Sequence, residues 1–253
     1  MSTSSEIAAA YNALLEDIEP LLFIVRDSGL QRAGIEALEA FVSRADQARI
    51  RAILEANEEH ANLFLGFRSA ARSLVNEMKM YLLLKQDDPE GAWSALIDAQ
   101  ELLGAASRAH QGFDYLGPKA NHLRDLEKWI FPPQVFVSAG MIVREQRCSI
   151  CDDDYERCDH IAGRPYLGRF CTIILKQASL DHVAIVDDPA DRRCRVTTFK
   201  VPGGTRNRMT WVITPDDENE SDSRSMKMII ATAGSASVDL RPAAETTIDQ
   251  PRY

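Results

Sequence analysis

Three cysteines and one histidine lie in a single short segment, residues 148–160, which reads CSICDDDYERCDH. Cys148, Cys151, Cys158 and His160 follow the pattern C-x2-C-x6-C-x-H. The two-residue gap lets both thiolates of a tight turn face one ion, and the C-x-H pair supplies the other two corners of a tetrahedron. Three thiolates and one imidazole suit Zn²⁺, and four protein ligands are typical of a structural site. The pattern therefore predicts a structural zinc centre formed by these four residues.

Other uses of the same side chains stay open. The cysteines could be small core residues, but the polar DDDYER between them is more typical of a loop over a metal. An iron–sulfur cluster or a redox role would use the same thiolates, and a catalytic zinc would need one ligand position left open for water. Cys171 and Cys194 lie in apolar, strand-like segments and are expected to be buried thiols. Cys171 is the substitute ligand if His160 does not bind.

The chain before residue 131 shows helical periodicity in its apolar residues. The first helix has one apolar face and is expected to kink or split at Pro20. Further helices are expected at 35–42, 46–86, 88–110 and 119–130. In the longest of them, Asn57 interrupts the apolar face and Gly66 is the one place where a bend is expected. The segment EEHANLF, which starts at Glu58, does not have the H-E-x-x-H spacing of a zinc motif and is interpreted as a polar helix face.

After Pro133 the pattern changes to short β-branched segments separated by turn residues. Strands are expected within 134–143, 170–176, 182–187, 193–201, 209–214 and 226–233. VPGGTRN, residues 201–207, is expected to form a hairpin turn. The sequence thus predicts an α+β protein, with an N-terminal helical bundle over residues 1–131 and a small zinc-stabilised antiparallel β domain over 132–234. The polar tail, 235–253, is expected to be disordered.

Composition and charge narrow the functional classes. The formal net charge is −9, which argues against general affinity for nucleic acid or anionic lipid. The amino-terminal residues lack the basic start and apolar run of a signal peptide, and no run of about 18 apolar residues is present to span a membrane. We therefore expect a cytoplasmic protein of a bacterium or viral host, with reduced thiols. The long helices are expected to pack on each other or on another chain, as a protein partner or a homo-oligomer.

Two segments beside the Cys/His loop resemble a known family. VFVSAGMIV, followed by the metal loop and by LDHVAIVDDPADRRCRV, is similar to the carboxy-terminal half of the prohead (capsid maturation) proteases of tailed phages. The resemblance covers residues 134–200, and some members carry a Cys/His loop inserted at the same place. It implies that Ser138 matches the nucleophile and Gly140 the glycine after it. The family's catalytic histidine lies in a strand-rich first half, which the helical residues 1–131 do not match.

A catalytic set could also be assembled within the strands alone. Ser138, His182 and Asp187 or Asp188 supply a nucleophile, a base and an orienting carboxylate, provided that they come within hydrogen-bond reach. The ordinary interpretation is a strand serine and a histidine at a strand edge.

Residues 192–208 hold six basic residues and no acidic one, which is compatible with phosphate binding or with a solvated strand face. The first functional hypothesis is therefore a zinc-binding, non-catalytic interaction or assembly protein, related to a phage or mobile element. The alternatives are a prohead-protease-like serine hydrolase that uses Ser138 and a nucleic-acid-binding protein that uses residues 192–208.

Overall fold

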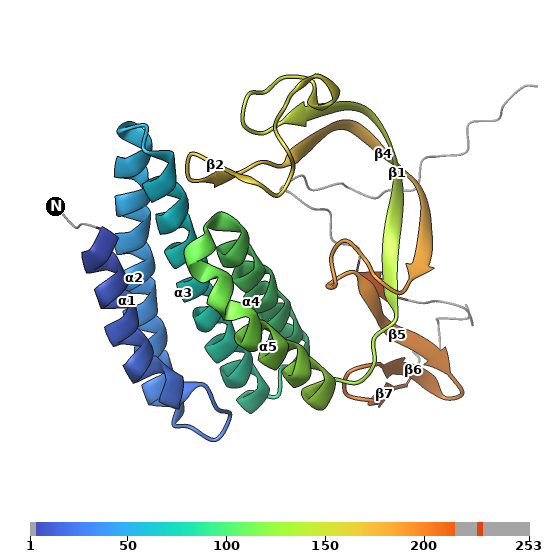
Figure 1. The fold of residues 1–253 in the computed structure, drawn as a ribbon. Helices are drawn as coiled ribbons and strands as arrows, with labels where there is room; N and C mark the ends of the chain where they lie inside the picture. Colours follow the sequence, from blue (N-terminus) through green and yellow to red (C-terminus); the bar gives the residue numbers. More distant parts are fainter. Residues whose placement is uncertain (1–3, 216–226, 230–253) are drawn as a thin grey trace, which may run out of the picture.

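The computed structural model describes residues 4–215 and 227–229 of the 253-residue chain (Figure 1). Helices occupy the amino-terminal part and a small antiparallel sheet follows, so the α+β class predicted from the sequence is confirmed. The helices are α1 (Ser4–Ile18), α2 (Ser28–Leu54), α3 (Glu58–Lys85), α4 (Pro89–Ala109) and α5 (Gly117–Ile130), with short 3-10 turns η1 (Glu19–Leu21) and η2 (Gln111–Leu116). The split expected at Pro20 occurs, because α1 ends at Ile18 and Pro20 lies in η1. No helix in the described part of the chain is long and apolar enough to cross a membrane.

The prediction of a single helix over 46–86 is wrong, because the chain reverses direction at residues 55–57. Ala56 has a positive φ of 51°, and the Asn57 side chain accepts a hydrogen bond from the His60 N–H at 3.1 Å. Asn57 therefore caps the start of α3 and does not merely interrupt an apolar face. The segment 35–42, expected as a separate short helix, continues through Asp46 within α2. The turn lays the apolar faces of α2 and α3 against each other.

α3 continues unbroken through Gly66, and the absence of a side chain there makes room for an aromatic ring. A Cβ atom at Gly66 would lie 2.2 Å from Cε2 of Phe113, whose buried ring also packs edge-on against Phe67 with centroids 5.0 Å apart. The ring cannot move aside without disturbing these neighbours. The glycine is therefore required by close packing between α3 and η2.

We expect Gly66→Ala to destabilise the protein. The overpacking cost of about 1–3 kcal/mol outweighs the gain of up to about 1 kcal/mol in helix propensity. Urea denaturation followed by circular dichroism measures the difference. Gly104→Ala in α4 is the matched control, because its new Cβ would meet only the mobile end of Arg108 at 3.3 Å. Equal stabilisation of both variants would contradict the packing argument.

Glu77 is a fully buried carboxylate on α3. Its side chain contacts the Lys119 ammonium of α5 at 2.7 Å and lies 3.9 Å from the His122 imidazole. Burial raises the pKa of Glu77 above its ordinary 4.5, although Lys119 and His122 oppose the shift. The folded state therefore holds the Glu77 proton more tightly than the unfolded chain does.

A folded-state pKa raised in this way favours folding most below pH 4.5, and the contribution is lost as the pH rises through the raised pKa. We expect the free energy of unfolding of the wild type, relative to Glu77→Gln, to fall over that window. Urea titrations of both proteins at several pH values measure this difference, in which effects common to both proteins cancel. A relative gain in stability with rising pH would show that the ion pair with Lys119 dominates instead.

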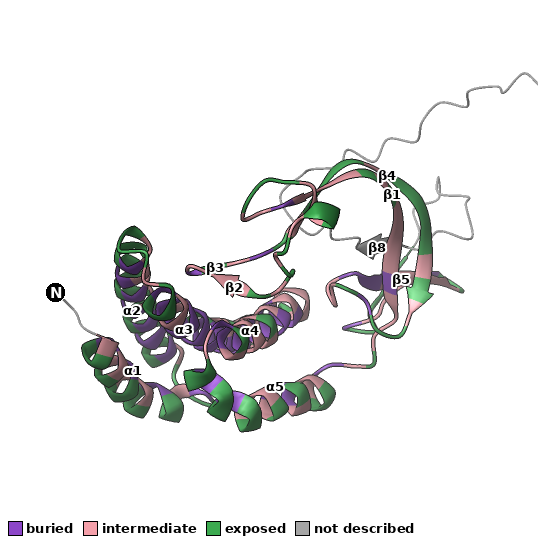
Figure 2. Cartoon of the chain, turned by 45° about the horizontal axis from the view of Figure 1, so that its top comes forward, coloured by how far each residue is buried: buried purple, intermediate pink, exposed green. Residues whose placement is uncertain are grey.

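The sheet is built around a long, curved two-stranded ribbon that arches over the helices (Figures 1 and 2). Strand β1 (Phe136–Cys148) pairs antiparallel with β4 (Ile173–Val186), with an irregularity between Gly140 and Met141. The segments 170–176 and 182–187, expected as two strands, both contribute to β4. β4 can include polar residues because most of its positions are exposed.

The other strands form a smaller region near the end of α5 (Figure 1). They are β5 (Arg195–Val201), β6 (Gly204–Asn207), β7 (Ile213–Thr214) and β8 (Lys227–Ile229), and the sheet order is β4-β1-β5-β6-β7 with β8 on β5. β5 and β6 form the hairpin expected at VPGGTRN, with Gly203 at φ 91°. The predicted strand at 226–233 is described only at β8, and the predicted disordered tail, 235–253, lies outside the described residues.

One large buried cluster serves both parts of the chain. It fills the space between the helices and also includes Phe131 and Met209, with Phe136 and Leu167 packed against it. Among the residues whose burial is described, the sheet has a second cluster of three buried residues, Val137, Cys194 and Val196. The sheet region thus depends on contacts with the helices for much of its packing.

Candidate metal centre

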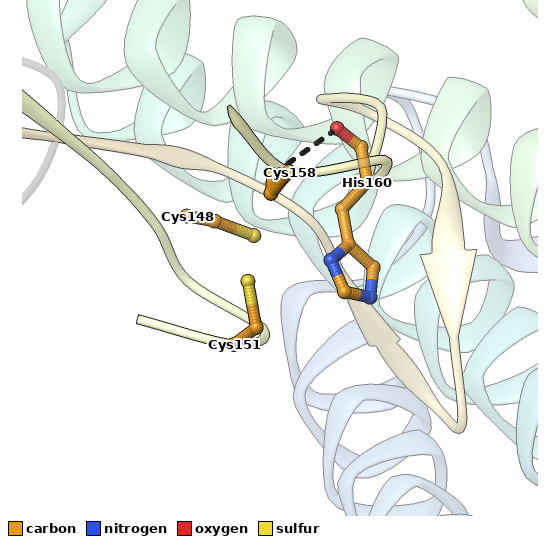
Figure 3. Close-up of side chains that lie close together, drawn as sticks. All are labelled: Cys148, Cys151, Cys158 and His160. Carbon is orange, nitrogen blue, oxygen red and sulfur yellow. Dashed lines mark hydrogen bonds between the residues drawn. The ribbon is translucent and has the colours of Figure 1, made fainter. Parts of the chain in front are cut away.

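The four predicted metal ligands converge in the structure. One ligand atom each of Cys148, Cys151, Cys158 and His160 lies within 4.8 Å of the others, and the three cysteines are free thiols (Figure 3). Cys148 is the last residue of β1, and the other three donors lie in the loop that follows the strand. The group could therefore hold one metal ion, as the spacing predicted.

The first two cysteines form a tight turn at the end of β1. The Ile150 N–H points at Sγ of Cys148 at 3.4 Å, and the Asp152 N–H donates to the Cys148 carbonyl at 2.9 Å. Asp152 closes the turn with a φ of 56°. A backbone N–H directed at a sulfur favours its thiolate form, which is the form that binds metals.

The other two donors lie on a loop that two tyrosines hold in place. After η3 (Tyr155–Arg157), the Tyr155 hydroxyl accepts a hydrogen bond from the Ala162 N–H at 3.0 Å, and the Tyr166 hydroxyl accepts one from the Ile161 N–H at 2.9 Å. The His160 ring packs edge-on against Tyr166, with centroids 4.7 Å apart. The buried Nδ1 of His160 has no hydrogen-bond partner among the described residues. A desolvated, unpaired nitrogen beside thiols suits a metal or a thiolate.

A fifth possible donor adjoins the group. Cys171 is fully buried between β3 (Arg169–Phe170) and β4, and its Sγ lies 3.7 Å from that of Cys148. From the sequence, Cys171 was expected to be a ligand only if His160 does not bind the metal. Cys194, by contrast, lies in the small cluster with Val137 and Val196, as expected for a buried structural thiol.

The thiols differ in their tendency to ionise. Burial opposes ionisation of Cys148, but the N–H groups of Cys151 and Ile150 and the neighbouring thiols lower its pKa to about 6. Burial and the proximity of Cys148 raise the pKa of Cys171 to about 11, and burial also raises that of Cys158. In the metal-free chain, one thiolate thus opposes formation of the next. A bound cation would remove that penalty, which is the donor chemistry of a metal site.

The metal loop, which carries the donors at residues 148–160, leads into a hairpin formed by β2 (Pro165–Tyr166) and β3. This hairpin reaches the helices. The Leu167 N–H at its tip donates to Oε1 of Glu58 at 3.2 Å, and the Gly168 N–H donates to Oδ1 of Asn62 at 2.8 Å. Nη1 of Arg49 donates to the Gly168 carbonyl at 2.9 Å. The expected polar helix face at Glu58 and Asn62 is therefore a docking surface for this tip. Nothing in the local sequence indicates so distant a partner.

The candidate catalytic residues are only partly brought together. Ser138 faces Ala184 and Gly140 faces His182 across the β1–β4 pair, so Ser138 and His182 share one face of the ribbon. Nδ1 of His182 contacts Asp181 at 3.0 Å, and both side chains are exposed. Asp187 follows the end of β4, five residues from His182, a distance of about 16 Å along an extended strand. The structure thus places Asp181, and not Asp187 or Asp188, beside the imidazole.

The basic segment 192–208 contacts the helices through its arginines. Arg192 pairs with Glu127 of α5, and Arg193 pairs with Asp98 and Glu101 of α4. Arg195 is only 2% exposed and pairs with Glu90 of α4. Three of the six basic residues therefore face acidic helix residues, which the sequence analysis did not foresee. This arrangement weakens the case for these three as phosphate-binding groups.

Comparisons with protein-family models, curated protein sequences and solved structures found no match to this chain.

Proposed function

We propose that this chain is a zinc-binding, non-catalytic assembly or interaction protein in which one structural Zn²⁺ organises the metal loop. The observation that carries the proposal is the convergence of one ligand atom each of Cys148, Cys151, Cys158 and His160, all within 4.8 Å of one another. Soft thiolates with an imidazole favour Zn²⁺ over hard cations such as Mg²⁺. The donors are sufficient to fill a tetrahedral shell, which leaves no position for a catalytic water.

The structural role is supported by what the loop contacts. Its hairpin tip reaches Glu58, Asn62 and Arg49, so an ion that orders the loop also orders a contact between the sheet and α2 and α3. Gly168 has a φ of 72°, and a Cβ there would lie 3.2 Å from that of Ala61. A loop of this length has too few apolar residues to fold alone, and metal binding supplies the missing free energy.

The interaction role is supported by apolar surface on β4 and not by the helices alone. The bundle buries most of the long helical stripes within itself, although Leu54 remains 81% exposed. Among the described residues β4 is an edge strand paired only with β1, and edge strands offer unpaired backbone groups to other chains. Its exposed apolar side chains are Ile174, Leu175, Leu180, Val183 and Ile185. The resemblance of residues 134–200 to prohead proteases suggests that the partner belongs to a phage or mobile element.

Two measurements test the proposal. Metal analysis of the purified chain should give about one Zn²⁺ per chain, and less than about half an equivalent would reject the zinc centre. Light scattering of the purified chain should show a mass above that of one chain. Ile185→Lys, at a 71% exposed position of β4, should lower that mass, and the matched Leu54→Lys on α2 should not. If Leu54→Lys lowered the mass and Ile185→Lys did not, the interface would lie on the helices. A chain that stays monomeric at all concentrations would exclude self-assembly.

A serine hydrolase is the second candidate, because His182 bears a carboxylate partner and shares a face with Ser138. A fluorophosphonate probe, which labels activated serines, separates the two proposals. We expect no labelling of the wild type. Labelling that Ser138→Ala abolishes, and that the exposed-site control Ser43→Ala retains, would establish the hydrolase instead.

A further inference from the structure

We propose that Cys171 is the fourth ligand of the metal centre, so that the shell is Cys148, Cys151, Cys158 and Cys171, with His160 outside it. The inference rests on the zinc centre proposed above and changes its composition. It makes the centre an all-thiolate site, which would bind soft cations.

The first argument is the distance between sulfurs. With Zn–S bonds of about 2.3 Å, two ligands of one tetrahedral zinc lie about 3.8 Å apart. Sγ of Cys148 and Sγ of Cys171 are 3.7 Å apart without a covalent bond. This is the edge length of the tetrahedron that a shared ion requires. The two thiols are also shielded from solvent, since both residues are fully buried.

The second argument is how firmly the backbone holds Cys171 at this place. Its N–H donates to the Arg164 carbonyl at 2.9 Å, and its carbonyl accepts from the Gly163 N–H at 2.8 Å. The next residue, Thr172, exchanges hydrogen bonds with Ser149 at 2.8 and 3.0 Å, directly beside Cys148. These hydrogen bonds place Cys171 between the metal loop and the end of β1. Such preorganisation is what a ligand on a rigid element provides.

The third argument concerns the partly exposed His160, which has another role available. Its ring stands edge-on to Tyr166, and its buried Nδ1 lacks a partner among the described residues. Figure 3 shows the ring beside the thiols of Cys148 and Cys151. An N–H group of this ring could donate a hydrogen bond to a thiolate of the proposed four-thiolate shell. Outer hydrogen bonds of this kind orient ligands and tune affinity.

X-ray absorption at the zinc edge of the wild-type, zinc-loaded full chain tests the inference without any substitution. We expect four sulfur neighbours at about 2.3 Å and no nitrogen in the shell. Three sulfurs and one nitrogen would overturn the inference and assign the fourth position to His160, while the zinc centre of the proposed function would stand. Absence of bound zinc would instead reject the proposed centre itself.

Variants give an independent measure, with competition titration of Zn²⁺ against a chromophoric chelator as the readout. Cys171→Ser should weaken binding by more than about 100-fold, the upper limit for loss of an outer contact, and His160→Ala by about 10–100-fold or less. Cys194→Ser removes another buried thiol, which lies in the small cluster with Val137 and Val196, and should leave the affinity unchanged. A greater loss with His160→Ala than with Cys171→Ser would overturn the inference. Helical circular dichroism of each variant shows that the bundle is still folded.

Discussion

Removal of the proposed Zn²⁺ should release residues 148–172 and the hairpin tip while the helical signal largely survives. The loop's donors would then lose the cross-link that holds three chain segments together, and the high pKa of Cys171 and the raised pKa of Cys158 would keep those thiols protonated. The helices have their own large buried cluster, which does not include the metal donors. Metal binding energy is local folding energy in such a module.

Hydrogen exchange measured by mass spectrometry, with and without a strong chelator, checks this prediction. We expect faster exchange at the backbone N–H groups of Leu167, Gly168 and Cys171, with little change in α3 and α4 away from the tip. Cys151→Ala should reproduce the effect of the chelator, and Cys194→Ser should not. Global unfolding on chelation would show that the helices depend on the sheet region. Unchanged exchange in the loop would show that the thiols pack adequately without a metal.

Breaking the buried ion pair of Arg195 with Glu90 should be the most destabilising single change at the contact between sheet and helices. Besides Glu90, the guanidinium contacts Oε1 of Gln134 at 3.1 Å and lies 5.4 Å from the ring centre of Trp93. Removing one partner of a buried pair costs about 3–5 kcal/mol, because the other charge remains desolvated. Glu90 is partly exposed, so Arg195→Met should cost about 3 kcal/mol, near the lower limit of that range.

Urea denaturation of the zinc-saturated chain measures that loss. The double variant Arg195→Met with Glu90→Gln should recover much of it, because no unpaired charge then remains. The exposed pair of Lys79 with Glu39, 3.3 Å apart, is the control, and Lys79→Ala should cost about 1 kcal/mol or less. Equal losses for Arg195→Met and Lys79→Ala would show that the buried pair contributes no more than a surface pair.

Local patterns predicted the parts of the fold that depend on local physics. Asp88 accepts a hydrogen bond from the Gly91 N–H at 2.9 Å and caps α4 at the start of the helix predicted over 88–110, because capping needs only neighbouring residues. The Pro202–Gly203 turn likewise has its cause within four residues. The break at Asn57 was not predicted from the sequence. An asparagine that caps a new helix and an asparagine on the face of a continuous helix cannot be distinguished until the path of the backbone is known.

The sequence by itself determined which four residues form the possible metal-binding group of the structure. The spacing of Cys148, Cys151, Cys158 and His160 brings them together because a two-residue turn and a short loop have few conformations. Only the tertiary structure brought in Cys171, since its approach to Cys148 depends on the register of β1 with β4. It also decided that Arg195 faces Glu90 and that Gly168 docks between Arg49 and Asn62. Contacts between residues more than 100 positions apart in the sequence arise from the packing of whole elements, and no local periodicity or spacing encodes them.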